Sequence, residues 1–400
     1  MNAKQLEALN IVKMNRNLFL TGSAGTGKSF TIKSIVNYFD INNISYGLTA
    51  LTGCAAVLIN GQTIHSFLGL GISRNLKEII KNLEKFKKQL EIIRNVKSLI
   101  IDEISMMDDE LFELINQLLK TVRKTDKIFG GIQVILVGDF HQLPPINNNY
   151  CFNSPLWNDL NLTSIVLTEI IRQKDDDVLK QILEEIRNEK LSDNSLEILQ
   201  NLVIKDKDDS DIKPTRLYPI NTNVDKINNY EYKKLLNTNK GIEVLYKASA
   251  NIKDTNLSNY DINLTLNAKI MIIRNICMEK KLVNGTRGIV IELRKTGIVM
   301  KDIDGNLHLI EYHIDKNVNG KKKLEIAFLP VKLAYAMSIH KSQGASIDNL
   351  EVDLGDDIFI SGQLYTALSR ATNIKHLRLS NFSKTSLIKN RNIKNFYESL

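Results

Sequence analysis

The residues with the clearest chemistry occupy positions 22–29, which read Gly-Ser-Ala-Gly-Thr-Gly-Lys-Ser and match the pattern GxxxxGK[ST]. An apolar segment precedes them and an amphipathic one follows, which predicts a strand, a loop and a helix. The N–H groups of such a loop wrap phosphate oxygens at a helix N-terminus. Lys28 is then expected to reach the β- and γ-phosphates, and Ser29 to ligate Mg²⁺. A glycine-rich turn that only caps a helix is the alternative, and the eight-residue match disfavours it.

Two carboxylates, Asp102 and Glu103, follow the apolar segment 98–101. The carboxyl ends of parallel strands form the edge at which α/β proteins bind ligands. Asp102 is therefore the expected Mg²⁺ partner, directly or through water. Glu103 is expected to polarise the attacking water, which favours a hydrolase over a kinase. An isolated Asp-Glu pair after a strand is usually a solvated turn, and the phosphate-binding pattern makes the functional interpretation the better one.

A third polar segment, GDFHQLPP at 138–145, follows another apolar run. Its adjacent prolines remove two N–H donors and stiffen the chain. Gln142 is therefore expected to be held rigidly toward the γ-phosphate.

The elements that position these residues alternate up to about residue 165, as in a parallel α/β sheet. The expected strands are 17–21, 45–49, 99–102 and 133–138, and the expected helices are 28–39, 53–58 and 108–123. Residues 71–97 read as a polar, basic insertion, and a strand at 164–167 with a helix at 178–188 is expected to begin a second region.

Farther along the chain the pattern changes. Residues 205–211 read as an acidic surface loop. Short β-rich pieces at 269–273, 288–293, 297–301 and 307–313 alternate with turn signals at 284–285, 304–305 and 319–320. These pieces predict a small antiparallel barrel inserted into the second α/β region.

Composition sets limits on the class of protein. The 400 residues are 43% hydrophobic and 24% charged, which is ordinary for a globular chain, and the net charge is +8. There is no apolar run of about 18 residues and no signal or transit pattern at the N-terminus. The cysteines Cys54, Cys151 and Cys277 lack CxxC spacing, which excludes a disulfide framework and a cysteine zinc site. We expect an intracellular protein without a membrane partner: cytoplasmic if prokaryotic, otherwise in the nucleus or at a viral replication site.

Lysines and arginines gather in 73–97 and after residue 375. Clustered positive charge suits a polyanion such as nucleic acid, and a solvated helix face is the alternative.

In their order along the chain these segments resemble superfamily 1 helicases, and among them the Pif (petite integration frequency) family of DNA helicases, relatives of RecD. Further matching segments are KQLEALNIV near the N-terminus, LTALTGCAAVLINGQTIHSF at 48–67, DEISMMDDELFELINQLLKTVR at 102–123, LTEIIRQ at 167–173, LVNGTRG at 282–288, AYAMSIHKSQGASID at 334–348 and GQLYTALSRATN at 362–373. An ordered set spread over most of the chain is far more specific than one motif.

The resemblance implies an α/β fold of two RecA-like P-loop lobes with parallel sheets and a small inserted SH3-like β-barrel. The first lobe is expected at 1–165, with a small wedge-like insertion near 68–95. The second lobe is expected at 166–261 and 330–400, and the barrel at 262–329.

The resemblance also implies the site residues. Arg172 and Arg370 are expected to stabilise charge on the transferring phosphoryl group, which arginine fingers do by ~10³–10⁵-fold. Surface salt bridges are the alternative for either arginine taken alone. The expected catalytic residues are Lys28, Glu103, Gln142, Arg172 and Arg370. The expected nucleotide-binding residues are Gln5, Gly22, Ser23, Ala24, Gly25, Thr26, Gly27, Lys28, Ser29 and Gly344.

Single-stranded DNA contacts are expected from Thr49, Thr52, His65, Phe67, His340, Lys341 and Ser342. Hydroxyls and lysines hold phosphates without reading sequence, and an aromatic ring can stack on a base. A core position is an equal alternative for Phe67.

The implied function is an ATP-dependent 5′-to-3′ DNA helicase that uses ATP and Mg²⁺ and acts on single-stranded and forked or structured DNA, monomeric when active. A superfamily 1 RNA helicase is the first alternative, because similar GDxxQLPP segments occur there. A non-catalytic nucleic-acid binding protein is the second, and the intact set of expected catalytic residues disfavours it.

Overall fold

The structure is a computed structural model that describes all residues except 72–73, 174–175, 204–213, 252–256, 259, 275, 278–279, 281, 283–285, 303–304, 320–321 and 348. The chain divides into two compact units. The first unit comprises Met1–Pro214 and Ser342–Leu400, and the second comprises Thr215–Lys341. Among the described residues, no helix combines the length and the apolar character needed to cross a membrane.

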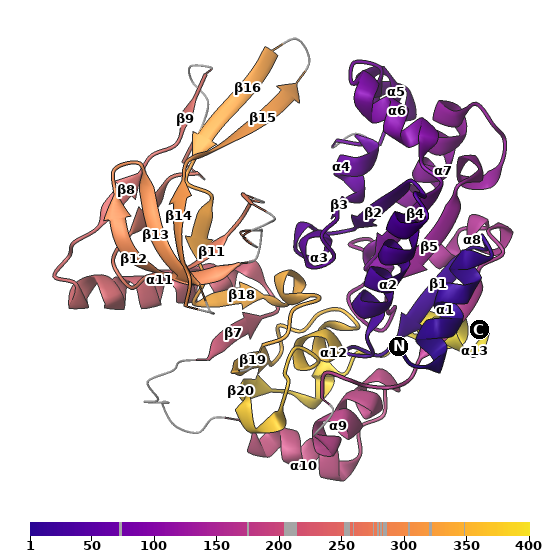
Figure 1. Ribbon diagram of the computed structural model, residues 1–400. Helices are drawn as coiled ribbons and strands as arrows, with labels where there is room; N and C mark the ends of the chain where they lie inside the picture. The colour runs from indigo at the N-terminus through magenta and orange to yellow at the C-terminus, as the bar shows by residue number, and fades with distance from the viewer. Residues whose placement is uncertain are drawn as a thin grey trace. The chain divides into compact units, whose positions relative to one another are not determined.

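A six-stranded parallel sheet with the order β3-β2-β4-β5-β1-β6 forms the centre of the first unit (Figure 1). Its strands are β1 Leu18–Gly22, β2 Tyr46–Ala50, β3 Gln62–Thr63, β4 Ser98–Asp102, β5 Gln133–Val137 and β6 Thr163–Leu167. Every residue of β1, β4 and β5 is buried, as expected for parallel strands covered on both faces. The four strands expected up to residue 138 are confirmed within one residue at each end.

Helices cover both faces of this sheet. They are α1 Ala3–Lys13, α2 Lys28–Ile41, α3 Gly53–Leu58, α4 Ile64–Leu68, α5 Leu76–Leu83, α6 Lys87–Asn95, α7 Asp109–Arg123 and α8 Leu156–Asp159. Because side chains alternate along a strand, Leu18 and Leu20 join the core that contains α1 and α2, whereas Phe19 joins the core that contains α5, α6 and α7.

The strand β6 and the last helix differ from the expected domain organisation. β6 pairs in parallel with the whole of β1, so it belongs to the first sheet and not to a second region, and the expected boundary at residue 165 falls inside it. Helix α13 (Arg391–Glu398) also packs on this sheet, since the ring of Phe396 lies 5.9 Å from Phe19 and 5.1 Å from Phe140. A hydrophobic pattern predicts an element but does not show which sheet the element joins.

The remaining elements of the first unit are α9 Asp177–Arg187, α10 Asp193–Asn201, β19 Leu350–Leu354, α12 Gln363–Leu368 and β20 Leu377–Phe382. Strands β19 and β20 pair in parallel, and α12 contacts α9 and β19.

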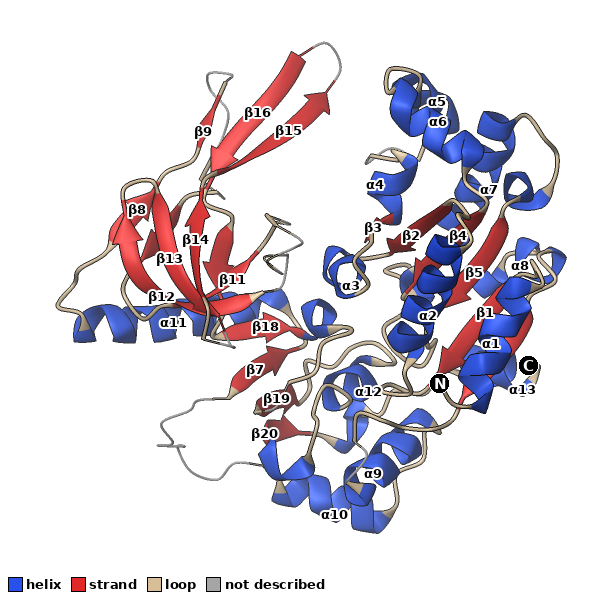
Figure 2. Cartoon of the chain, in the orientation of Figure 1, coloured by secondary structure: helices blue, strands red, loops and turns tan. Residues whose placement is uncertain are grey.

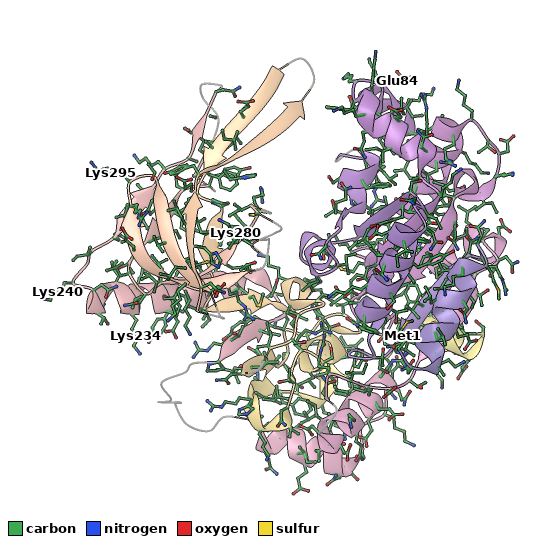
Figure 3. All side chains as sticks on the ribbon, viewed as in Figure 1. Met1, Glu84, Lys234, Lys240, Lys280 and Lys295 are labelled. Carbon is green, nitrogen blue, oxygen red and sulfur yellow. The ribbon has the colours of Figure 1, made fainter. Side chains whose placement is uncertain are left out.

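The basic insertion forms α5 and α6, and the two ends of α7 hold it. Arg74 donates two hydrogen bonds, of 2.9 and 2.8 Å, to the carboxylate of Asp108, which caps α7. At the other end of α7, Arg123 donates to the carbonyls of Ile93 and Val96 at 3.2 and 3.0 Å. The turn between the two insertion helices is exposed, and Figure 3 labels Glu84 there.

The second unit is built on antiparallel sheets (Figure 2). Its largest sheet has the order β14-β13-β12-β11-β17, with β11 Lys269–Ile272, β12 Arg287–Arg294, β13 Gly297–Asp302, β14 Leu307–Glu311 and β17 Val331–Leu333. The other strands are β7 Thr215–Tyr218, β8 Val244–Tyr246, β9 Ser249–Ala250, β10 Ile262–Leu264, β15 His313–Asn319, β16 Lys322–Phe328 and β18 Ala336–Ser338. β7 and β18 pair in parallel. Helix α11 (Asn221–Thr238) carries Lys234 on its exposed side (Figure 3).

The expected barrel is an open sheet in the part of the chain that the structure describes. β14 and β17 end the five-stranded sheet, and no pairing between them closes it. The predicted acidic loop at 205–211 and the turn at 284–285 lie outside the described residues, and those at 304–305 and 319–320 lie partly outside them.

Candidate functional site

The loop after β1 has the backbone that a phosphate-binding loop requires. Gly25 and Gly27 have φ of 81° and 89°, in the left-handed region that favours glycine. A Cβ atom at Gly25 would lie 2.6 Å from Cβ of Arg172, so this position also has no room for a side chain. Gly27 is the N-cap of α2, and the exposed Ser29 is in the first turn of that helix. The loop therefore fits a bound phosphate chain at a helix N-terminus.

Lys28 lies against the loop that it follows. Its Nζ atom donates hydrogen bonds to the carbonyls of Gly22 and Ser23 at 2.7 and 3.0 Å. Burial lowers the pKa of Lys28, and the charges of Asp139, Glu103 and Asp102, in that order, oppose the shift. Three carboxylates thus lie near one half-buried ammonium group next to the loop.

Asp102 and Glu103 lie together at the end of β4, and both are buried. Burial, and secondly the charge of Glu103, raises the pKa of Asp102. Such a pair favours a nearby cation. No cluster of three or more His, Cys, Asp or Glu side chains among the described residues forms a cation site. The buried carboxylates of Asp102 and Glu103 are hard oxygen ligands, which fit a Mg²⁺ ion whose other ligands are phosphate oxygens and water.

Gln142 and Arg370 meet in the interior of the first unit. Arg370 is 1% exposed, and its Nη2 atom donates to Oε1 of Gln142 at 3.5 Å and to Oγ of Ser369 at 2.7 Å. Its Nε atom donates to the carbonyl of Thr366 at 2.9 Å. Burial, and secondly Arg172, lowers the pKa of Arg370 to about 9. Arg370 therefore keeps its charge at neutral pH.

Arg172 connects the phosphate-binding loop to the chain around Gly344. Its backbone N–H donates to the carbonyl of Gly25 at 3.2 Å. Its guanidinium donates to the carbonyls of Ser369 and Gly344 at 2.9 and 3.4 Å. A Cβ atom at Gly344 would lie 3.7 Å from Oε1 of Glu103. The five expected catalytic residues thus all lie in the first unit, and these contacts link them around the loop.

Gln5 lies beside Gly27, the N-cap of α2. Its amide oxygen accepts from the N–H of Asn2 at 3.0 Å in a capping box. Its Nε2 atom is buried, has no hydrogen-bond partner among the described residues, and lies 2.7 Å from where a Cβ of Gly27 would be. This donor fits an acceptor supplied by a bound ligand.

Sequence reasoning assigned no role to two further residues of this site. The hydroxyl of Tyr365 accepts a 2.8 Å hydrogen bond from the N–H of Ala24. The amide of Gln343 donates to Oε2 of Glu103 at 2.9 Å. Both residues stand in the segments that carry the resemblance, 334–348 and 362–373, so their position in those segments was the available signal.

Two of the expected DNA contacts are structural. Phe67 is 3% exposed and belongs to the core on one face of the sheet, where its ring fills the space beside Gly47. Phe67 is therefore a core residue, and the expectation that its ring stacks on a base is wrong. Thr49 is fully buried on β2 and donates to the carbonyl of Ile100 at 2.7 Å, so its hydroxyl does not face a phosphate.

The other expected DNA contacts stay predictions. Thr52 and His65 in the first unit are half-buried. Burial, and secondly the charge of Arg74, lowers the pKa of His65. Ser342 is buried in the first unit, whereas His340 is half-buried and Lys341 is exposed in the second.

Comparison with known proteins agrees with this geometry. Residues 1–200 match the family model of the PIF1-like helicases, and residues 249–293 match that of the DNA helicase Pif1 2B domain. The ATP-dependent DNA helicase Pif1 of Bdellovibrio bacteriovorus is 32% identical over the whole chain, which covers 92% of that protein. The ATP-dependent DNA helicase PIF1 of Xenopus laevis is 35% identical over the whole chain, which spans 64% of that protein's length. The crystal structure of the Pif1 helicase from Candida albicans is 32% identical, with a TM-score of 0.89 over 100% of this chain and 99% of that one.

Proposed function

The chain belongs to the PIF1-like helicase family, and from that premise we propose that it is an ATP-dependent DNA helicase that moves 5′-to-3′ along single-stranded DNA and unwinds duplexes. The observation that carries the proposal is the meeting of Arg172 and Arg370 with the loop at 22–29, Gln142 and Glu103 in one unit. A protein that only binds nucleic acid has no use for two arginines brought to a phosphate-binding loop.

The residues divide the work of ATP hydrolysis. The N–H groups of the loop and Lys28 bind the phosphates, and Gln5 contacts the base. Ser29 and Asp102 would hold Mg²⁺, which would neutralise charge on the phosphates. Glu103 polarises the attacking water, and Gln142 orients it. Arg172 and Arg370 stabilise the charge that develops on the transferring phosphoryl group.

The domain organisation of the proposal has two RecA-like lobes, expected at 1–165 and at 166–261 with 330–400, with β6 and α13 assigned to the sheet of the first lobe. Movement along DNA then follows from lobe closure, because arginines after residue 166 contact a phosphate held before it. We propose that 262–329 is the SH3-like insertion, which is supported by the antiparallel sheet β14-β13-β12-β11-β17 and its apolar core.

The α5–α6 insertion is the proposed strand-separating wedge. Arg74 and Arg123 tie it to both ends of α7, so it can stay in place while it pushes two DNA strands apart. Its turn exposes Phe86 next to Lys85 and Lys87, which offers an aromatic ring and positive charge to DNA.

The proposed partners are single-stranded and forked DNA, with the active protein a monomer inside the cell. The net charge of +8 supports binding to a polyanion.

A strand-displacement assay with 5′-tailed and 3′-tailed duplexes tests the proposal. We expect ATP-dependent unwinding of the 5′-tailed duplex only, and none by Lys28→Ala. Unwinding of the 3′-tailed duplex alone would overturn the direction. ATP hydrolysis stimulated by single-stranded RNA and not by DNA would favour the RNA helicase, and no ATP turnover would favour the non-catalytic binding protein.

A further inference from the structure

The helix α13 places the hydroxyl of Tyr397 between two loops of the nucleotide site. This hydroxyl lies 2.9 Å from Oγ1 of Thr21, the residue before Gly22. It donates to Oδ1 of Asp139 at 3.1 Å and accepts from the N–H of Phe140 at 3.1 Å. One hydroxyl therefore connects the end of β1, where the phosphate-binding loop starts, with the segment that follows β5.

Asp139 extends this connection to Gln142. The carbonyl of Asp139 accepts the backbone N–H of Gln142 at 2.9 Å, so the two residues form one turn. The carboxylate of Asp139 is fully buried, and Oδ1 also accepts from Nη2 of Arg187 at 3.4 Å. Moving this carboxylate would displace the turn that carries Gln142.

Two neighbouring side chains pack against the aromatic ring of Tyr397. The ring of His141 stacks on it with 4.6 Å between centroids and 18° between planes. The guanidinium of Arg187 lies 5.1 Å from the ring centroid. These contacts hold the hydroxyl in one place, so its hydrogen bonds can fix the positions of both loops.

We propose that Tyr397 is a positioning residue for ATP hydrolysis. Its hydroxyl holds the phosphate-binding loop and the loop that carries Gln142 at a fixed distance from each other. The inference rests on the proposed function, because it assigns Gln142 to the hydrolytic step. Tyr397 acts through Thr21 and Asp139.

The test separates the hydroxyl from the ring. Tyr397→Phe keeps the stacking on His141 and removes only the hydrogen bonds. Tyr150→Phe is the matched control, since Tyr150 is a buried aromatic residue of the same core whose hydroxyl bonds Asn390 and Ser361 instead of Thr21 and Asp139. Steady-state ATPase with saturating single-stranded DNA is measured for each full-length variant below its melting temperature.

We expect kcat of Tyr397→Phe to fall about 10-fold with KM for ATP within about twofold, because small misplacements of reacting groups cost up to ~10²-fold in rate. Tyr150→Phe should match the wild type in both constants. A residue that only stabilises the fold would lower the melting temperature of either variant and leave kcat of the folded enzyme unchanged. Unchanged kcat in Tyr397→Phe would overturn the inference.

Thr21→Val removes the hydroxyl that bonds Tyr397, and so breaks the same connection on the side of the phosphate-binding loop. We expect it to lower kcat by a similar factor, and the double variant with Tyr397→Phe to be no slower than the slower single variant. Losses that multiply would mean that the two residues act independently, and would overturn the inference. Absence of ATP turnover in the wild type would instead overturn the proposed function together with this inference, so the two failures are distinguishable.

Discussion

Gln343 donates a hydrogen bond of 2.9 Å from Nε2 to Oε2 of Glu103, between residues 240 positions apart in the sequence. Both side chains are buried, and Oε1 of Gln343 has no hydrogen-bond partner among the described residues. Glu103 has a left-handed backbone with φ of 55°, so its side chain leaves the chain in an unusual direction. Gln343 therefore fixes the carboxylate proposed to polarise water, and it stands two residues after Lys341, an expected DNA contact.

Replacing Gln343 should slow the chemical step. Hydrogen bonds to charged groups are worth ~1.5–3 kcal/mol, so we expect Gln343→Ala to lower kcat by roughly 10–100-fold with little change in KM for ATP. Gln343→Glu places a second carboxylate against Glu103 and should be slower still. Steady-state ATPase measures both, and Gln181→Ala, on exposed α9 sequence, is the control. A rise in KM without a fall in kcat would show that Gln343 serves binding.

Substitutions of Glu103 and of Lys28 should impair different steps, ATP turnover and nucleotide binding respectively. Glu103→Gln leaves Ser29 and Asp102 in place, so nucleotide and Mg²⁺ binding should persist while most turnover is lost. Lys28→Ala should weaken nucleotide binding itself. Equilibrium binding of a fluorescent ATP analogue, together with ATPase, separates the two. Equal losses of nucleotide affinity would contradict this division of roles.

Arg370→Ala should keep DNA binding and lose DNA-stimulated hydrolysis and unwinding. The side chain also bonds buried carbonyls, so the variant leaves acceptors unpaired and should lose ~1–3 kcal/mol of stability. Arg370→Lys keeps the charge and separates the two effects. ATPase rate against single-strand concentration is the measurement, with the exposed Arg391→Ala as control. Stimulation at the wild-type level in the alanine variant would make Arg370 a structural residue.

Lys341→Ala should weaken single-strand binding equally for all sequences and reduce the salt slope by about one counterion. Lys332→Ala, also exposed in the second unit, is the matched control and should leave the slope unchanged. Dissociation constants for several oligonucleotides at different salt concentrations give the answer. A loss of affinity that differs between base sequences would show base-specific discrimination by Lys341 and would contradict a phosphate contact.

His141 should make stability depend on pH. Burial is the main cause that lowers the pKa of His141, to about 4, from its usual value near 6.5. The unfolded chain then binds more protons than the folded one between these values, so this contribution is full above about pH 6.5 and is lost as pH falls toward 4. His141→Phe keeps a ring against Tyr397 and should lose less melting temperature between pH 7 and 5 than the wild type. His376→Phe, at an exposed position, should show the wild-type loss. If His141→Phe lost as much melting temperature between pH 7 and 5 as the wild type, His141 would not be the source of the pH dependence.

Local signals predicted most of the first sheet and of the phosphate-binding loop. The strands that end at Gly22 and Asp102 are short apolar runs. The glycines and acids that do the chemistry stand at the end of each run or directly after it, so they can be read from the sequence. Gln5, Arg172 and Arg370 were predicted from the motifs around them, and the structure places Arg172 against Gly25 of the loop.

Features that depend on tertiary packing could not be predicted in this way. β6 reads as a strand in either sheet, and only its pairing with β1 assigns it. Phe67 and Thr49 stand in a segment rich in expected DNA contacts, but strand alternation and core packing turn both side chains inward. Tyr397 lies within the short amphipathic helix α13, and nothing near it in sequence points to Thr21.

The docking of α13 also has a consequence for synthesis of the chain. Phe19 and Phe140 leave the ribosome early, whereas their partner Phe396 follows more than 250 residues later. At ~5–20 residues per second, the apolar face that α13 covers stays open for roughly 10–50 seconds after β6 is made. Chaperones that bind nascent apolar surfaces therefore have a window on this face, and substitutions in α13 should reduce the yield of folded protein more than they reduce the stability of protein that has already folded.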